Sequence, residues 1–228
     1  MIGVSVLTLL LLVPPAQGRT TSSSVLPNRA SSLTAYPHGP ADVRVSPGGR
    51  HIATLPPHSD YAYQRLALLV LAEARTPDGT RWLRVRLPAR HGAPSGWINA
   101  SKATTRVNPW RIEISNASGT MRLLRRGKVV RSAKVVVGSA QTPTPRGLHA
   151  LHDRWSPEED FYAGWILSLT TVSPQVPTLG GVPAVVAIHG WNGAERGAGS
   201  LGCVRVADVA MGRVLVRNVP AGTPVLVS

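Results

Sequence analysis

The chain has 228 residues, enough for one sizeable hydrophobic core or two small ones, and 43% of its residues are hydrophobic. Its formal net charge of +14 is spread over both halves of the sequence, which favours contact with a polyanion. We find no helix-turn-helix, zinc-finger or RNP-like pattern and no Gly-rich phosphate loop, so we expect no nucleic-acid partner and no nucleotide chemistry.

The first 18 residues have the pattern of an export signal. Residues 1–18 contain an apolar run shorter than the ~20 residues of a membrane-spanning helix, followed by Pro14, Pro15 and an Ala16-x-Gly18 spacing. This pattern predicts a secretory signal peptide. An uncleaved anchor is the alternative, because the segment has no Lys or Arg before the apolar run. In both cases we expect an exported protein of the cell wall or periplasmic space, membrane-tethered if uncleaved, for which anionic wall polymers are the fitting polyanion.

Residues 19–40 are rich in Ser, Thr and Pro without apolar periodicity, which predicts a flexible linker. Short strands are expected to follow. The segments 66–74 and 81–88 flank Asp78-Gly79, a strong hairpin signal because both turn residues tolerate positive φ.

The stretch DGTRWLRVRLPARHGAPSGWI, residues 78–98, resembles the bacterial SH3-like domain. The resemblance covers residues 41–106 and implies a small β-barrel in which the Trp-x-x-Val and Gly-Trp-Ile strands pair. Such modules bind peptides or cell wall. A rigid spacer remains the alternative.

The second half restarts the strand pattern. Residues 110–138 alternate apolar and polar side chains through two hairpins that turn at 117–119 and 126–127. A buried strand is expected at 185–190, and residues 208–219 form the one clear helix. Asp208 is its N-cap, and the segment GTPVLV that closes the chain is a further strand. The fold class is therefore mainly β.

Cys203 is the only cysteine, so it forms no intramolecular disulfide in an oxidising compartment. By itself it is either a buried thiol or a nucleophile. A nucleophilic thiol needs a base, and His189 lies fourteen residues earlier, where an expected strand ends. The Gly-rich loop between them allows the two to meet. Backbone N–H groups of residues 199–202 are placed to face an oxyanion, and Arg205 supplies a cation that favours thiolate.

These residues closely resemble the catalytic motif of the L,D-transpeptidases, in which His-Gly is followed by Ser/Thr-x-Gly-Cys-hydrophobic-Arg. The segment VVVGSAQTPTPRGLHAL at 135–151 resembles the part of this family that lines the donor pocket. The resemblance covers residues 108–228. It implies a β-sandwich catalytic domain with one packed helix, after the SH3-like barrel.

The resemblance also implies roles. It makes Cys203 the nucleophile, His189 the base and then the acid, and the Gly190 carbonyl the group that orients the His189 ring. The oxyanion hole would be the N–H groups of Gly202 and Cys203, and the expected substrate-binding residues are Arg205, Ser200 and Trp191. No metal and no cofactor is implied.

The implied reaction is ping-pong acyl transfer between peptidoglycan stem peptides. A tetrapeptide stem acylates the thiol and loses D-alanine, and a neighbouring stem resolves the thioester to give a 3-3 cross-link. Carbapenem-type inhibitors are expected to acylate the same thiol. Two alternatives remain open: an L,D-carboxypeptidase, in which water resolves the thioester, and a non-catalytic peptidoglycan-binding protein.

Two positions depart from the family pattern. Leu201 stands where His is often found, and Trp191 stands where Thr is frequent. We hypothesise that Trp191 covers the acyl pocket and sets substrate preference.

For several other polar and aromatic residues we expect a structural role rather than a catalytic one. His149 and His152 form an H-x-x-H pattern, but we do not expect zinc, because a strand turns residues i and i+3 to opposite faces. The acidic residues 158–160 predict a solvent-exposed loop. Alternatively, their negative charge attracts the ammonium group of the acceptor. Trp155 and Trp165 are expected in the core or in a pocket wall.

Overall fold

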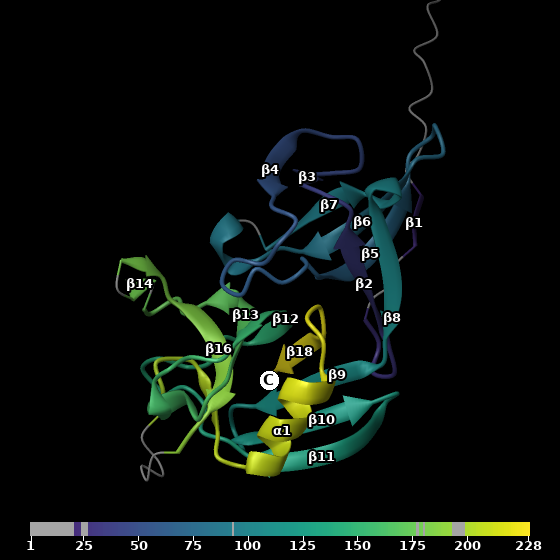
Figure 1. The fold of residues 1–228 in the computed structure, drawn as a ribbon. Helices are drawn as coiled ribbons and strands as arrows, with labels where there is room; N and C mark the ends of the chain where they lie inside the picture. Colours follow the sequence, from purple (N-terminus) through teal and green to yellow (C-terminus); the bar gives the residue numbers. More distant parts are fainter. Residues whose placement is uncertain (1–20, 24–26, 93, 177, 180, 193–198) are drawn as a thin grey trace, which may run out of the picture.

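The computed structural model describes residues 21–23, 27–92, 94–176, 178–179, 181–192 and 199–228. The signal peptide expected at 1–18 lies outside them. Two eight-stranded sheets follow one another along the chain, each with its own hydrophobic core, and the described residues contain a single α-helix (Figure 1). The protein is therefore mainly β, as the strand patterns predict.

The first sheet, which we call the N-terminal sheet, has the order β4-β3-β7-β6-β5-β2-β8, and β1 pairs with β5. Two short 3-10 helices, η1 (Ala89–His91) and η2 (Ala100–Lys102), interrupt the later strands. The strands are β1 (Thr21–Ser23), β2 (Ser32–Pro37), β3 (Ala41–Arg44), β4 (His51–Leu55), β5 (Leu68–Arg75), β6 (Arg81–Arg86), β7 (Ser95–Asn99) and β8 (Ala103–Asn108). The Trp-x-x-Val and Gly-Trp-Ile strands pair as β6 and β7; the SH3-like assignment itself stays a prediction.

Strand β2 departs from the linker expected over residues 19–40. It lies between β5 and β8 in the N-terminal sheet, and its side chains are mostly buried. The backbone ladder to both neighbours stabilises it, and Thr34 is a β-branched residue that suits a strand. Thr34 also packs on Gly222, where a Cβ would lie 2.4 Å from its Cγ2. A strand in a Ser- and Thr-rich segment is not predicted from its sequence, because pairing with neighbouring strands stabilises it and it shows no apolar periodicity.

The second sheet, the C-terminal sheet, has the order β11-β10-β9-β18-β12-β13-β16-β17, and β14 and β15 form a separate small hairpin. A 3-10 turn, η3 (Asp160–Tyr162), precedes β13. The helix α1 (Val209–Asn218) lies against the C-terminal sheet (Figure 1), and its Met211 and Leu215 belong to the hydrophobic core. The strands are β9 (Trp110–Ser115), β10 (Thr120–Arg125), β11 (Lys128–Lys134), β12 (Gly147–Trp155), β13 (Ile166–Val172), β14 (Thr178–Leu179), β15 (Val182–Pro183), β16 (Val185–Gly190), β17 (Val204–Val206) and β18 (Pro224–Val227).

The local signals of this half agree with the structure. The two hairpins turn between β9 and β10 and between β10 and β11, at the expected residues. Asp208 caps α1, because its carboxylate accepts a 2.7 Å hydrogen bond from the N–H of Met211. None of the described residues forms a helix long and apolar enough to cross a membrane.

Side chains of strand β12 contact the N-terminal half of the chain. The pairing of β12 with β13 shifts between Leu151 and Asp153, and a shift of this kind changes which face the following side chains point to. As a result His149 and His152 both contact the N-terminal sheet, through Arg86 at 3.3 Å and Asp60 at 3.3 Å. The expectation that they point to opposite faces is wrong, because it assumed a regular strand.

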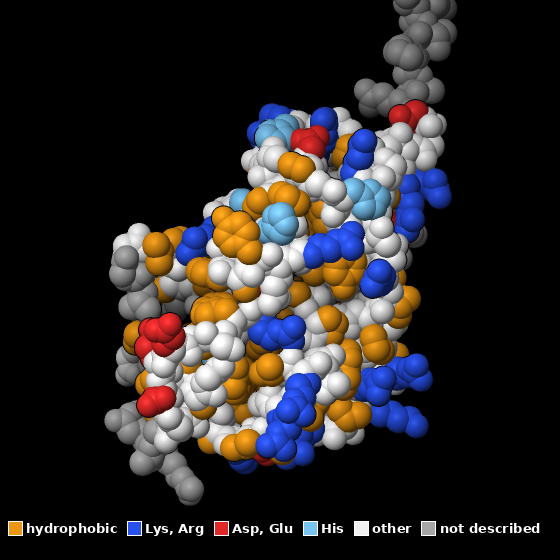
Figure 2. Space-filling model, in the orientation of Figure 1, with side chains coloured by type: hydrophobic (Ala, Val, Ile, Leu, Met, Phe, Trp, Pro, Cys, Tyr) orange, Lys and Arg blue, Asp and Glu red, His pale blue; other side chains and the backbone are white. Residues whose placement is uncertain are grey.

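The charge of the protein is distributed over both sheets. Lys and Arg side chains are scattered over the face in Figure 2 from one sheet to the other, whereas Asp and Glu are few. The positive potential is therefore a property of the whole molecule rather than of one patch.

Candidate active site

The pairing of β16 with β17 brings the histidine and the cysteine together. These strands are parallel, with Ile188 opposite Val204 and His189 opposite Arg205. One step earlier in the same register, Cys203 lies beside Ala187, and the backbone of Ala187 is close enough to the thiol to lower its pKa. Alternate residues of a strand share a face, so Ala187 and His189 point the same way. The thiol therefore lies next to the face that carries the imidazole.

His189 is buried and held by its own neighbour. Its Nδ1 lies 2.7 Å from the carbonyl oxygen of Gly190. A carbonyl only accepts, so Nδ1 carries the proton and Nε2 carries the free lone pair. Burial lowers the pKa of His189, the hydrogen bond to Gly190 opposes this, and the Arg205 charge lowers the pKa further. The ring is thus a neutral base at neutral pH.

A glycine is required at position 190. A Cβ there would lie 2.5 Å from the carbonyl oxygen of Tyr162 and 2.7 Å from Nε1 of Trp165. Any side chain would push the η3 turn away from the strand that carries His189. The carbonyl of Gly190 therefore sets the tautomer of the His189 ring, and the lack of a side chain at Gly190 lets the η3 turn pack against β16.

Cys203 is partly exposed at the surface. Burial of the sulfur raises the pKa of its thiol, and the backbone of Ala187 and the charge of Arg205 oppose that shift. Burial therefore favours the neutral form of both the Cys203 thiol and the His189 imidazole.

Two aromatic residues of η3, which were not predicted as site residues from the sequence, lie around His189. The Tyr162 ring meets the imidazole edge-on at 5.1 Å, and Phe161 lies at 5.7 Å. Burial raises the pKa of Tyr162, and the neighbouring Cys203 raises it further, so Tyr162 lies close to both groups. Adjacent aromatic residues in an otherwise acidic loop were the available signal.

Ser200 is buried and positions the loop that precedes the thiol. Its hydroxyl donates to the carbonyl of Cys203 and accepts a 3.0 Å hydrogen bond from the N–H of Gly202. The expected contact of Ser200 with substrate does not fit this place, because the hydroxyl is occupied inside the protein. The N–H of Gly202, expected in the oxyanion hole, is likewise engaged by Ser200.

The segment that resembles the donor-pocket part of the family lies against this loop. Gly138 bridges to Ser200, and Val136 pairs with Arg205 through backbone hydrogen bonds of 3.0 and 2.8 Å. The hydroxyl of Thr142 donates to the carbonyl of Ser200 at 2.7 Å. These bonds fix the backbone on both sides of Cys203.

Arg205 and Trp191 form a stacked pair. The guanidinium lies 4.3 Å from the Trp191 ring centroid and 5.5 Å from that of Phe161, which stabilises the cation. Trp191 lines a cavity of about 270 Å³ beside α1, together with Trp165, and this cavity does not include Cys203. The hypothesis that Trp191 covers the pocket at the thiol therefore does not match its position.

The cavity that does include Cys203 has a volume of about 180 Å³ and is mainly apolar. We call it the thiol pocket. Leu201, which is 57% exposed, lines this pocket. Trp155 lines it too, which confirms the prediction that Trp155 lies in a pocket wall. The other lining residues are Tyr61, Ser168, Val176, Val182, Pro183, Ala184, Val185 and Val186.

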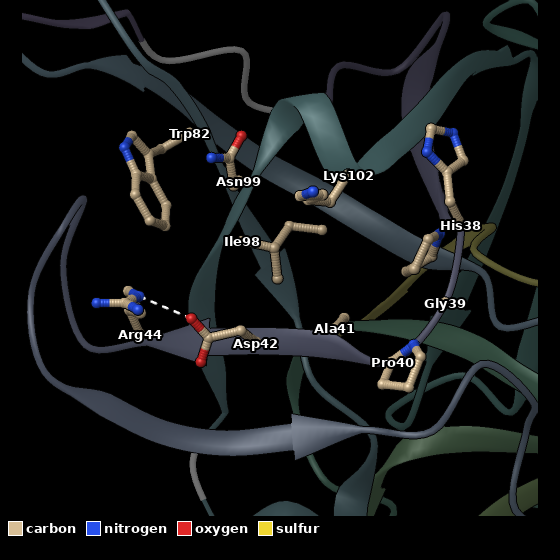
Figure 3. Close-up of a pocket in the computed structure, with 11 residues that line it drawn as sticks. His38, Gly39, Pro40, Ala41, Asp42, Arg44, Trp82, Ile98, Asn99 and Lys102 are labelled. Atoms are coloured by element: carbon tan, nitrogen blue, oxygen red, sulfur yellow. Dashed lines mark hydrogen bonds and ion pairs between the residues drawn. The ribbon is translucent and has the colours of Figure 1, made fainter. Parts of the chain in front are cut away.

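A larger cavity of about 710 Å³ lies in the N-terminal sheet (Figure 3). Trp82, Ile98 and Lys102 surround it, and Asp42 pairs with Arg44 at its edge with a 2.8 Å contact. None of the residues expected to be catalytic lines it. The candidate chemistry therefore belongs to the smaller cavity.

The acidic residues 158–160 are exposed and precede the two aromatic residues of η3. They fit the solvated loop expected from the sequence.

Comparison with known proteins agrees with this site. The model of the family described as YkuD, the L,D-transpeptidase catalytic domain, matches residues 109–227. No protein of curated function matches the sequence significantly.

Solved structures with partial similarity include three L,D-transpeptidases. An Ldtfm–avibactam carbamoyl enzyme is 22% identical with a TM-score of 0.40, over 53% of this chain and 49% of that one. A C442S mutant from Enterococcus faecium is 20% identical with a TM-score of 0.41, over 52% and 49%. The NMR structure of the E. faecium catalytic domain is 25% identical with a TM-score of 0.36, over 52% and 96%. The chain thus spans about half the length of the first two.

The family match covers residues 109–227, more than half of the 228, and includes His189, Gly190, Gly202, Cys203 and Arg205. The chain belongs to the L,D-transpeptidase catalytic domain family.

Proposed function

We propose that this protein is an exported cell-wall L,D-transpeptidase that forms 3-3 peptidoglycan cross-links through an acyl-enzyme on Cys203. The observation that carries the proposal is the position of the thiol beside the face of His189, with the Nδ1 of that ring held by the Gly190 carbonyl. This is the arrangement of a nucleophile and an oriented base. The substrates are peptidoglycan stem peptides as donor and acceptor, and anionic wall polymers are a further partner for the basic surface.

In the proposed first step, Nε2 of His189 takes the thiol proton and Sγ of Cys203 attacks the carbonyl carbon of the third stem residue. The carbonyl oxygen becomes an oxyanion, and the N–H of Cys203 donates to it. The N–H of Gly202 joins only if it exchanges its bond to Ser200. The bond to the fourth residue then breaks, and D-alanine leaves as the amine with the proton from the imidazolium.

In the second step, the side-chain amine of a neighbouring stem attacks the thioester carbonyl, and His189 accepts a proton from that amine. The new amide forms as the Cys203 sulfur leaves and is reprotonated. We propose that Arg205, stacked on Trp191, meets a carboxylate of a stem peptide. Each step uses only side chains and backbone groups of this chain.

The proposal is tested by incubating the mature protein with a disaccharide tetrapeptide and following intact mass and products. We expect an adduct on Cys203 that lacks D-alanine, followed by a dimer of stems. Cys203→Ala abolishes both, whereas Ser132→Ala, an exposed serine on β11, serves as the matched control. A carbapenem is expected to add its mass to Cys203 and to block the adduct.

The other outcomes of this experiment separate the alternatives. Release of tripeptide without dimer, over a range of acceptor concentrations, indicates an L,D-carboxypeptidase. Absence of adduct and turnover, with wall binding retained in Cys203→Ala, indicates a non-catalytic peptidoglycan-binding protein. Either result contradicts the proposal.

A further inference from the structure

The thiol pocket is built from both sheets. Nine of its wall residues and Cys203 belong to the C-terminal half of the chain, but Tyr61 comes from the loop between β4 and β5 of the N-terminal sheet. The distance in sequence from Tyr61 to Cys203 explains why no local motif indicates this contact. The N-terminal sheet therefore reaches the candidate active site directly.

Several contacts fix Tyr61 in this place. Its ring stacks on Trp155, with centroids 5.0 Å apart and planes 25° from parallel, and the Arg90 guanidinium lies 4.7 Å from its centroid. The buried carboxylate of Asp153 accepts hydrogen bonds from the N–H groups of Tyr61 and Ala62 at 2.7 and 3.0 Å. The backbone and the ring are thus both held, and a preorganised wall of this kind is what substrate selection requires.

The chemistry of the lining defines the group that fits. Apart from the thiol and the hydroxyls of Tyr61 and Ser168, the pocket presents aliphatic side chains, Trp155 and backbone. Among the residues that the structure describes, no Lys, Arg, Asp, Glu or His lines it. Burying a charged group there would be costly, whereas an aliphatic group gains from contact with the rings and with the valines.

We propose that Tyr61 is a specificity-determining residue of the C-terminal site, and that the thiol pocket holds an uncharged aliphatic group next to the atom that Cys203 attacks. For the proposed function, this group is an aliphatic portion of the donor stem that flanks the scissile bond. The identification of this group as part of the donor stem rests on the proposed function. The preference of the pocket for an uncharged aliphatic group does not.

The test uses the full chain and methanethiosulfonate reagents, which need no stem peptide. The Cys203 thiolate attacks the sulfenyl sulfur, a mixed disulfide forms, and methanesulfinate leaves. The readout is the ratio of rate constants for the propyl reagent and the 2-sulfonatoethyl reagent, each divided by its rate with free cysteine. We expect this ratio to fall at least threefold in Tyr61→Ala and to stay within twofold of the parent in Tyr61→Phe.

Two further variants sharpen the result. Tyr63→Ala is the matched control, because Tyr63 belongs to the same loop but is 81% exposed and does not line the pocket. Tyr61→Lys is expected to reverse the preference by drawing the anionic reagent. An unchanged ratio in both Tyr61→Ala and Tyr61→Lys, with folding verified by thermal unfolding, overturns the proposal.

The donor stem distinguishes this inference from the proposed function. We expect Tyr61→Ala to raise KM for the tetrapeptide severalfold with a smaller change in kcat, and Tyr63→Ala to leave both unchanged. If the reagents respond as expected but no stem acylates Cys203, the proposed function fails and the pocket preference stands. If stems are processed with the same KM in parent and Tyr61→Ala, the substrate part of the inference fails.

Discussion

At the scale of single residues, burial favours the uncharged forms of the Cys203 thiol and the His189 imidazole. This favours a protonated thiol in the free protein. For the proposed function, we expect proton transfer to accompany attack on the carbonyl. A protonated thiol is also less readily oxidised than a thiolate.

The raised pKa of Cys203 predicts a specific pH dependence for alkylation by iodoacetamide. Because the pKa lies above the ordinary value of 9.0, the rate is expected to rise about tenfold per pH unit from pH 7 to above pH 9. Stopped-flow or mass-spectrometric rates measure it, and free cysteine, which levels off earlier, is the control. A plateau that begins below pH 8 would show a thiolate–imidazolium pair instead.

Ser200 gives a second prediction at this scale. Ser200→Ala removes hydrogen bonds to the carbonyl of Cys203 and the N–H of Gly202, and leaves these groups without that partner. We expect a loss of about 1–3 kcal/mol in the free energy of unfolding, and a lower rate of acylation with little change in KM. Urea unfolding and single-turnover acylation measure the two effects. Ser132→Ala should change neither, and equal behaviour of the two variants would contradict the positioning role.

At the scale of elements, β9, β10, β11, β16, β18 and α1 of the C-terminal half could be predicted because their signals are local, whereas β13 and β17 were not predicted. Hairpin turns, the 185–190 apolar run and the Asp208 cap each lie within a few residues of the element they define. Strand β2 and the irregularity in β12 could not be predicted, because partners distant in sequence stabilise them. For the same reason the motif around Cys203 and His189 was visible in the sequence, whereas the contribution of Tyr61 was not.

The cap of α1 supports a prediction of stability. Asp208 accepts from the Met211 N–H and pairs with Arg131 at 3.0 Å, and the hydrogen bond from Met211 is the main cause of its lowered pKa. Asp208→Ala is expected to lower the free energy of unfolding by about 1 kcal/mol at neutral pH. Asp208→Asn should lose less, because an amide oxygen still caps the helix.

The pH dependence checks the cause. A carboxyl with a folded pKa below its unfolded value stabilises the fold above about pH 4 and loses this effect as the pH falls through the folded pKa. The difference between parent and Asp208→Asn, measured by urea unfolding from pH 7 to pH 2, should therefore shrink in acid. A difference independent of pH would argue against a role for the charge.

At the scale of the whole molecule, the two sheets meet through buried polar side chains. Asp153 is 2% exposed and accepts from the loop of Tyr61, His152 lies against Asp60, and Asn108 donates to Thr223 at 2.9 Å. Buried polar contacts tolerate little misalignment. The N-terminal sheet is thereby held in one orientation over the thiol pocket.

Asp153→Asn tests this arrangement. The amide retains one acceptor oxygen but loses the charge that strengthens the bonds to the N–H groups of Tyr61 and Ala62. We expect the free energy of unfolding to fall by about 1–3 kcal/mol, and hydrogen exchange at these two amides to accelerate. Asp42→Asn, which alters an exposed ion pair in the N-terminal sheet, should change stability by less than ~1 kcal/mol. Unchanged exchange at residues 61 and 62 would show that the loop is held by other contacts.

The register shift in β12 has a consequence for exchange of modules between proteins. The shift occurs where His152 and Asp153 contact the loop between β4 and β5. These contacts form only when that loop covers the two side chains. A chimaera with a different N-terminal module would leave a carboxylate dehydrated and unmatched. The contact between the two halves adjoins the thiol pocket, because Asp153 holds the loop that carries Tyr61. Exchange of the N-terminal module is therefore expected to require matching changes in this contact.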